Sequence, residues 1–256
     1  MKIRFFISSP NDFVELLQQQ LEEAGHTVVY EGSDVDLIHI LGAPTYRAKK
    51  IMGGARSRLI PVVWSPMRTV NKWMLHHATA VHVWGRHEQE HLQKLAKNTT
   101  VFLIKNPIVT NDITKRALLA GIIQLYDNIL KKHDTQIRSN IEERITKMGE
   151  TEEVLHQVLF EFLYIRYLFQ RHAIPVDALR NLRNIMTSNN YNEDDIETLL
   201  KRLKLHDFIA SLEKVIEEEA SLTEGFEPVP ALDNRHTKKI RKVIIKEDIN
   251  NENPTT

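Results

Sequence analysis

DVDLIHILGAPTYRAKKIMGGARSRLIPVVWSPMR, residues 34–68, is the stretch that decides the fold class. Two apolar runs, VDLIHILG and LIPVVWSP, lie on either side of a segment that can form a helix. Each run is rich in apolar and β-branched residues and ends in turn residues, as a buried parallel strand does. The stretch therefore predicts a βαβ unit. Because open α/β sheets bind ligands beyond the carboxyl ends of their strands, we expect a site at residues 42–45 and 65–68.

The remainder of the first 110 residues continues this alternation. KIRFFI at residues 2–7 predicts a first strand, and the phrase EEAGHTVVY contains the second. Two further strands are expected at residues 80–84 and 100–104, with helices between the strands. The helix inside the deciding stretch is expected over residues 43–52, with Gly53 and Gly54 ending it. Together these segments predict an α/β fold with a doubly wound parallel sheet over residues 1–110.

Beyond residue 110 the spacing of apolar residues changes to the 3.6-residue period of helices. We expect an all-helical module over residues 111–222, and the absence of alternating segments there supports it. From about residue 221 the chain becomes polar, charged and proline-containing. Such a composition predicts a flexible, largely disordered tail over residues 223–256.

The charge of the chain is unevenly distributed, although 34 Lys and Arg balance 34 Asp and Glu. Residues 37–87 contain no Asp or Glu. The same segment carries eight cationic residues: Arg47, Lys49, Lys50, Arg56, Arg58, Arg68, Lys72 and Arg86. This pattern is typical either of a solvated basic face or of a surface that binds an anionic ligand.

Several classes of protein are disfavoured by the composition. No run approaches the roughly 18 apolar residues that a membrane span needs. There is no cysteine, which fits a reducing compartment. We expect a cytoplasmic protein without a transmembrane segment. Nucleic acid is not expected as a partner, because no recognition-helix pattern accompanies the basic segment.

The order of these segments resembles a known family. The phrases KIRFFISSP, EEAGHTVVY, DVDLIHILGAP, RLIPVVWSPM, HATAVHVWGRHEQEHL and TVFLIKNPI follow one another as in the N-terminal, acceptor-side half of GT-B glycosyltransferases of the family-four type. The resemblance covers residues 1–108. It implies a Rossmann-like domain, half of a GT-B fold, and hexosyl transfer from a nucleotide-sugar.

The chain also departs from that family. Ser8, Ser9 and Pro10 stand where such enzymes usually have a Gly-Gly loop, and Met67 stands where a histidine is common. The donor-binding half, with its E-x7-E motif, has no counterpart: eight residues after Glu224 comes Leu232. The resemblance therefore implies that a partner chain or a second copy supplies donor binding.

The candidate ligand-binding residues follow the ends of the predicted strands. Arg68 and Lys72 would supply charge for the phosphates of a nucleotide-sugar, which a transferase must stabilise electrostatically. Helix N-termini and hydroxyl groups add hydrogen-bond donors. The full set is Ser8, Ser9, Gly42, Thr45, Ser65, Arg68, Lys72 and Asn106. No catalytic residue and no cofactor are assigned.

A competing motif lies in the same half. His87, Glu88 and His91 match H-E-x-x-H, which on a helix places two imidazoles one turn apart to hold zinc. Glu142 or Glu143 could complete such a site. The alternative is a solvated pair of histidines on an ordinary amphipathic helix. His39 and His82 alternate with apolar strand residues, and we expect His39 to be a hydrogen-bonded core residue.

Three functions follow from these observations. The first is a glycosyltransferase-like protein that handles a sugar or another anionic acceptor. The second is a non-catalytic module that binds a ligand or a protein, with a protein partner or a second copy docking through the helical module. The third is a zinc hydrolase acting through His87, Glu88 and His91.

Overall fold

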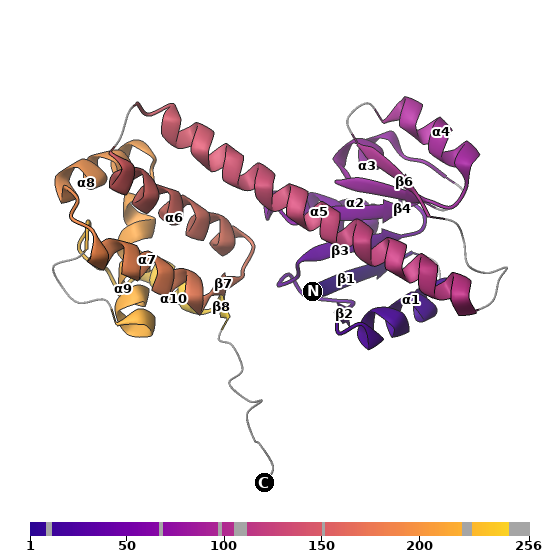
Figure 1. Ribbon diagram of the computed structural model, residues 1–256, viewed down its shortest axis with the longest axis horizontal. Coiled ribbons are helices and arrows are strands. Elements are labelled where there is room, and N and C mark those ends of the chain that lie inside the picture. Colours follow the sequence, from indigo (N-terminus) through magenta and orange to yellow (C-terminus); the bar gives the residue numbers. More distant parts are fainter. Residues whose placement is uncertain are drawn as a thin grey trace, which may run out of the picture. The chain divides into compact units, whose positions relative to one another are not determined.

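The computed structural model describes residues 1–8, 12–66, 69–96, 99–104, 112–149, 152–221 and 227–245. The chain divides into two compact units, Met1–Gln136 and Ile137–Thr256. Helix α5 (Asp112–Thr146) contributes residues to both units (Figure 1). The boundary predicted at residue 110 lies outside the described residues.

Unit 1 contains a six-stranded sheet in the order β2-β1-β3-β4-β5-β6. Every neighbouring pair of strands is parallel, which confirms the predicted parallel sheet. Strands β3, β4 and β5 are buried along their whole length, as their continuous apolar sequences predict. The strands are β1 (Lys2–Ile7), β2 (Thr27–Val29), β3 (Leu37–Leu41), β4 (Val62–Ser65), β5 (Ala80–Val83) and β6 (Thr100–Leu103).

Helices cover both faces of this sheet (Figure 1). One core lies between the sheet and α2 (Tyr46–Ser57), α3 (Lys72–His77) and α4 (Arg86–Leu95). A second core lies between the opposite face and α1 (Asp12–Glu23) together with residues 122–129 of α5. The sheet of unit 1 is therefore doubly wound. The strand order changes direction at β1, which places the crevice of such folds between the carboxyl ends of β1 and β3.

The predicted strand, helix and strand of the deciding stretch are β3, α2 and β4. The helix differs from its predicted extent, because it begins at Tyr46 and continues through Gly53 and Gly54 to Ser57. Each glycine inside a helix costs about 1 kcal/mol relative to alanine. The buried side chains of Met52 and Ala55 on either side of the glycines offset this cost.

Unit 2 is mainly helical, as predicted. It contains the end of α5, and then α6 (Glu153–Gln170), α7 (Val176–Ser188), α8 (Glu193–Arg202), α9 (His206–Ala220) and α10 (Arg235–Arg241). Two short parallel strands, β7 (Ile174–Pro175) and β8 (Ile244–Ile245), join the start of α7 to the chain after α10. Within the parts of the chain that the structure describes, no helix is long and apolar enough to cross a membrane.

The prediction of a disordered tail is wrong for residues 227–245. This segment packs on α9, where the amide of Leu232 donates to the carbonyl of Ala210 at 2.8 Å. Asn234 and Thr237 form a capping box at the start of α10. Arg241 donates to both carboxylate oxygens of Glu218, at 2.8 and 2.6 Å. The prediction was wrong because the segment is polar on average but contains a few apolar residues that are buried. The other residues of the predicted tail, 223–226 and 246–256, lie outside the described residues.

The packing of residues 227–245 on α9 predicts that two isoleucine substitutions lower the free energy of unfolding by different amounts. Ile240 is fully buried, whereas Ile245 is 42% exposed. We expect Ile240→Ala to lower the free energy of unfolding by about 2–5 kcal/mol, because it leaves a cavity. Ile245→Ala, the control, should change it by less than about 0.5 kcal/mol. Urea unfolding measures both, and two neutral variants would contradict the docked segment.

Candidate functional site

The carboxyl edge of the unit 1 sheet brings several predicted site residues together. At the end of β1, the Ser8 amide donates to the Leu41 carbonyl at 3.0 Å, which joins β1 to β3. At the end of β3, the Gly42 amide donates to the Ser65 carbonyl at 2.9 Å, which joins β3 to β4. Ser8, Gly42 and the backbone of Ser65 therefore line one continuous edge.

Gly42 is required by the backbone at this edge. Its φ angle is +113°, in a region that residues with a side chain rarely adopt. Its carbonyl accepts a hydrogen bond from the indole Nε1 of Trp64 at 3.1 Å. The chain can therefore turn directly from β3 toward α2 while the buried indole stays hydrogen-bonded.

Thr45 begins α2 at this edge. It is the N-cap, and its hydroxyl oxygen accepts a hydrogen bond from the Ala48 amide at 3.1 Å. The first turn of α2 carries no acidic residue. The first amides of a helix have no partner within the helix and attract anions. The start of α2 is therefore electropositive.

Lys72 begins the short helix α3, which follows β4 and contacts α2. Asn71 caps this helix by accepting a hydrogen bond from the Met74 amide at 3.1 Å. The side chain of Lys72 is exposed. The structure thus places Lys72 on an element that starts from the same edge of the sheet as α2.

Two exposed aromatic residues lie at the starts of these helices, and the sequence analysis did not single them out. Tyr46, the first residue of α2, is 81% exposed. Trp73, in α3, is 41% exposed and stacks on His77 with ring centroids 4.3 Å apart. The position of Tyr46 directly after the capping residue Thr45 is a sequence signal that marks it as a candidate, although its exposure follows from the packing of α2. Trp73 has no such signal, because Lys72 stands between it and the capping residue Asn71.

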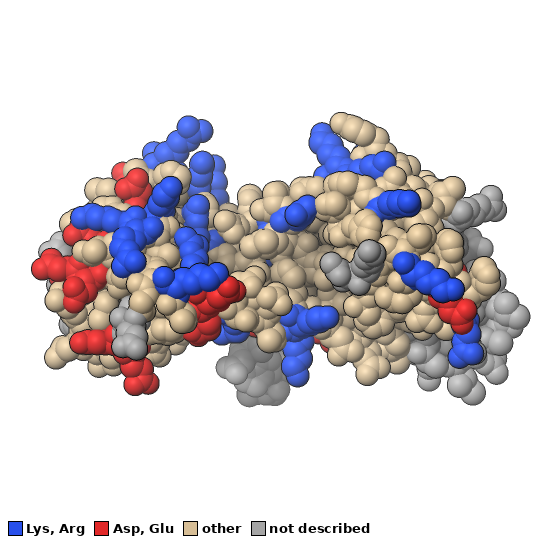
Figure 2. All heavy atoms as spheres, turned by 90° about the horizontal axis from the view of Figure 1, so that it is seen from above, with Lys and Arg blue, Asp and Glu red and all other residues tan. Residues whose placement is uncertain are grey.

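The cations of this region are available for a partner. In the described part of the chain, none of the side chains of Arg47, Lys49, Lys50, Arg56 and Lys72 forms an ion pair. Figure 2 shows Lys and Arg side chains on the upper face of unit 1 with very little acidic surface among them. The five cations named above all lie within residues 37–87, which contain no Asp or Glu.

The side chain of Ser65 belongs to a buried network instead of the open edge. Its hydroxyl lies 2.7 Å from Nε2 of His39 and 2.8 Å from Nδ1 of His82, and the residue is 0% exposed. The chain of contacts continues from Nδ1 of His39 to the Tyr126 hydroxyl, 2.5 Å away. At its other end, Nε2 of His82 lies 3.4 Å from the Ile104 carbonyl.

The directions of these hydrogen bonds follow from one group, since the Ile104 carbonyl can only accept. Nε2 of His82 therefore donates, and in a neutral ring its Nδ1 then accepts the Ser65 hydroxyl proton. The oxygen of Ser65 in turn accepts from Nε2 of His39, whose Nδ1 accepts from Tyr126. All four ring nitrogens and both hydroxyl protons are used with both histidines neutral. This confirms the prediction that His39 is a hydrogen-bonded core residue.

The electrostatics of the network agree with neutral rings. Burial lowers the pKa of His82 to about 4. Burial, and secondarily the neighbouring His82, holds the pKa of His39 well below its usual value. Burial also raises the pKa of Tyr126, so its hydroxyl keeps the proton that it donates.

Three other predicted site residues, Ser9, Arg68 and Asn106, lie outside the described residues. The predicted zinc ligands lie on α4, where His87 and His91 are exposed and Glu88 is half-buried. Within the described ranges, no three His, Asp or Glu side chains are grouped to hold a metal. Of the two carboxylates considered as a third ligand, Glu142 pairs with His156 and Glu143 pairs with Lys147.

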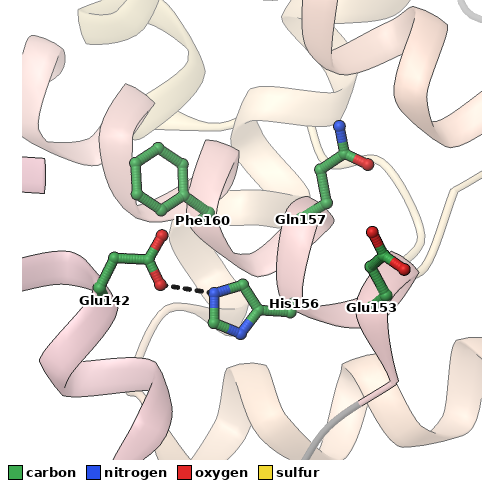
Figure 3. Close-up of a pocket in the computed structure, with 5 residues that line it drawn as sticks. All are labelled: Glu142, Glu153, His156, Gln157 and Phe160. Atoms are coloured by element: carbon green, nitrogen blue, oxygen red, sulfur yellow. Dashed lines mark hydrogen bonds and ion pairs between the residues drawn. The ribbon is translucent and has the colours of Figure 1, made fainter.

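Unit 2 has a hollow of its own between α5 and α6 (Figure 3). Its volume is about 580 Å³, and Glu142, Glu153, His156, Gln157 and Phe160 line it. The carboxylate of Glu142 lies 2.6 Å from Nε2 of His156, and Figure 3 shows this pair connecting the helix of Glu142 with the helix that carries His156, Gln157 and Phe160. The pair joins α5 to α6, which gives it a structural role.

One carboxyl group in unit 2 is buried without a counter-ion. Glu213, on α9, is 0% exposed. Burial, followed by repulsion from Glu227, raises the pKa of Glu213 to about 10. The side chain is therefore protonated in the folded protein at neutral pH.

No family model, no curated protein and no solved structure matches this chain. The glycosyltransferase resemblance therefore stays an expectation from the order of the sequence segments.

The buried network predicts that the Tyr126 hydroxyl stabilises unit 1. Tyr126→Phe removes the donor to Nδ1 of His39 and leaves a buried acceptor unsatisfied, which costs about 1–3 kcal/mol. Tyr46→Phe, the control, removes a hydroxyl from an exposed ring and should change stability by less than about 0.5 kcal/mol. Equal unfolding midpoints in urea for the two variants would contradict the network.

The buried carboxyl predicts a pH-dependent penalty. In the unfolded chain Glu213 ionises near pH 4.5, but in the folded protein it keeps its proton up to a pKa of about 10. Between these values the folded state binds the extra proton, so stability falls as the pH rises. Glu213→Gln removes this dependence and should stabilise the protein at pH 8 by an amount on the order of a few kcal/mol.

At pH 5 the difference between Glu213→Gln and the parent protein should nearly vanish, because the parent carboxyl then needs little energy to stay protonated. Glu153→Gln, at an exposed position of the same unit, serves as the control and should track the parent at both pH values. A Glu213→Gln stability difference that does not grow between pH 5 and pH 8 would refute the buried neutral carboxyl.

Proposed function

We propose that unit 1 binds an anionic ligand of the nucleotide-sugar class at the carboxyl edge of its sheet. The observation that carries the proposal is the start of α2. There an electropositive helix terminus, the exposed ring of Tyr46 and the unpaired cation Arg47 occur together at the edge where doubly wound folds bind ligands.

Each part of a nucleotide-sugar has a complementary group in this region. Backbone amides at the start of α2 suit a phosphate, and the cations Arg47 and Lys72 add long-range attraction. The flat, exposed rings of Tyr46 and Trp73 suit stacking against a base or the apolar face of a sugar. Gly42 allows the backbone to turn at this position without a side chain that would cover the edge.

Transfer of the sugar would need further groups. The segment that includes the ends of β3 and β4 carries no carboxylate, because residues 37–87 contain no Asp or Glu, so this segment offers no acidic side chain as a proton acceptor. The glycosyltransferase resemblance implies that a partner chain or a second copy supplies the donor-binding half. We propose glycosyl transfer as an activity of such an assembly, in which unit 1, the acceptor-side half, contacts the phosphates of the nucleotide-sugar at the start of α2 and the partner completes donor binding.

A second candidate is a non-catalytic binding module derived from such a half. It is favoured by unit 2, whose described residues form helices and two very short strands instead of a second parallel sheet. Under this proposal the ligand binds at the same edge of unit 1 without turnover, and unit 2 binds the protein partner.

Calorimetric titration of the full chain with UDP, GDP and their common sugar conjugates tests the proposal. We expect saturable binding that Arg47→Gln weakens about fivefold, the effect of removing roughly 1 kcal/mol of charge attraction. Arg56→Gln is the matched control, because Arg56 lies in the last turn of the same helix, at its opposite end. Absence of binding, or equal losses in both variants, would refute a site at the start of α2.

Release of free nucleotide from the bound conjugate, measured with candidate acceptors, then separates the two candidates. Release that depends on an added acceptor supports the transferase, and binding without release supports the non-catalytic module.

A further inference from the structure

We propose that unit 1 has a second binding site, a pocket at the amino end of the sheet that takes a small organic anion with an apolar body. The pocket has a volume of about 420 Å³. It includes Ala80 and Thr100, the first residues of β5 and β6. Parallel strands place their amino ends on one edge of a sheet and their carboxyl ends on the other, so this pocket is separate from the start of α2.

The interior of the pocket is suited to an apolar group. Ala78 and Ala80 are buried on one side, and Phe102 and Ile129 contribute larger apolar surfaces. Small-molecule sites typically have volumes of about 300–1,000 Å³ with mainly apolar walls. The pocket therefore has the size and the lining for an aromatic or branched aliphatic body.

The polar groups of the pocket favour a negative charge on that body. Lys132 and His133, on α5, and His76, on α3, all line it. Within the described residues, no Asp or Glu is part of the lining. The side chain of Lys132 is exposed, so its ammonium group stays hydrated in the free protein and can pair with a carboxylate or sulfonate at the entrance of the pocket.

The pocket also offers hydrogen-bond donors. Asn128 lines it, and so does Thr79, whose hydroxyl oxygen accepts a hydrogen bond from the Val62 amide at 2.9 Å. The Thr79 hydroxyl proton remains available to a ligand.

The end of α3 lies beside this pocket, and carbonyl groups at the end of a helix repel anions. Two of these carbonyls are already occupied, that of Trp73 by Nδ1 of His77 and that of Leu75 by the Thr99 hydroxyl.

Fluorescence titration of the full chain with 8-anilinonaphthalene-1-sulfonate tests this site, because the probe joins an aromatic body to a permanent anion. We expect one saturable site whose dissociation constant rises about threefold to fivefold in Lys132→Gln. Lys131→Gln is the matched control, because Lys131 is the exposed neighbour on the same helix and does not line the pocket. It should leave the constant unchanged.

A second pair of variants tests the apolar interior. Thr100→Phe places a ring in the pocket at the first residue of β6 and should abolish binding of the probe. Thr27→Phe makes the same change at the exposed first residue of β2 and should leave binding intact. Thermal unfolding of each variant shows that the fold persists, and nucleotide binding at the start of α2 should be the same in all of them.

Absence of saturable probe binding would overturn the proposal, and so would binding that Thr100→Phe leaves intact. If Thr100→Phe abolishes binding but Lys132→Gln matches Lys131→Gln, recognition of the anion is overturned and the site is an apolar one. Because the nucleotide titration is separate, failure of this site is distinguishable from failure of the site at the start of α2.

Discussion

The structure of unit 1 depends on one buried chain of hydrogen bonds that crosses the middle of its sheet. It links Tyr126 of α5 to His39 of β3, Ser65 of β4 and His82 of β5. Four polar side chains inside an apolar core would each be costly if any of them lacked a partner. Because every group has one, the chain fixes which helix covers this face and how the three central strands are aligned.

The network also explains why the edge of the sheet is organised as it is. Ser65 directs its side chain inward and its carbonyl toward the Gly42 amide. The turn at Gly42 then leads to Thr45 and the start of α2. A buried serine thus determines where an exposed helix terminus lies, although its own hydroxyl is not available to a ligand. The amino end of the same sheet has a different character, with apolar walls, Lys132 of α5 and histidines contributed by α3 and α5.

The features that the sequence predicts well are local ones. The strands β3 and β4 could be read from short apolar runs with turn residues at their ends, and the helices of unit 2 from their apolar period. The contact between His39 and Tyr126 spans 87 positions, and no local pattern encodes it. The docking of residues 227–245 was missed because it depends on a few apolar side chains, Ile240 among them, in a polar segment. At the edge, Gly42 and Thr45 were found from turn and capping chemistry, whereas the exposure of Tyr46 becomes evident only from the packing of α2.

The long-range contact made by Tyr126 has a consequence for synthesis of the chain. All six strands are complete once residue 103 has been made, yet the face of the sheet that carries His39 is still uncovered at that point. The ring nitrogen that Tyr126 satisfies has to wait for α5 to emerge from the ribosome. A nascent chain therefore contains all six strands of the sheet, with one face still uncovered, until about two dozen further residues have been made. A fragment that keeps both cores of unit 1 therefore has to include α5 through Ile129 and cannot end at the last strand.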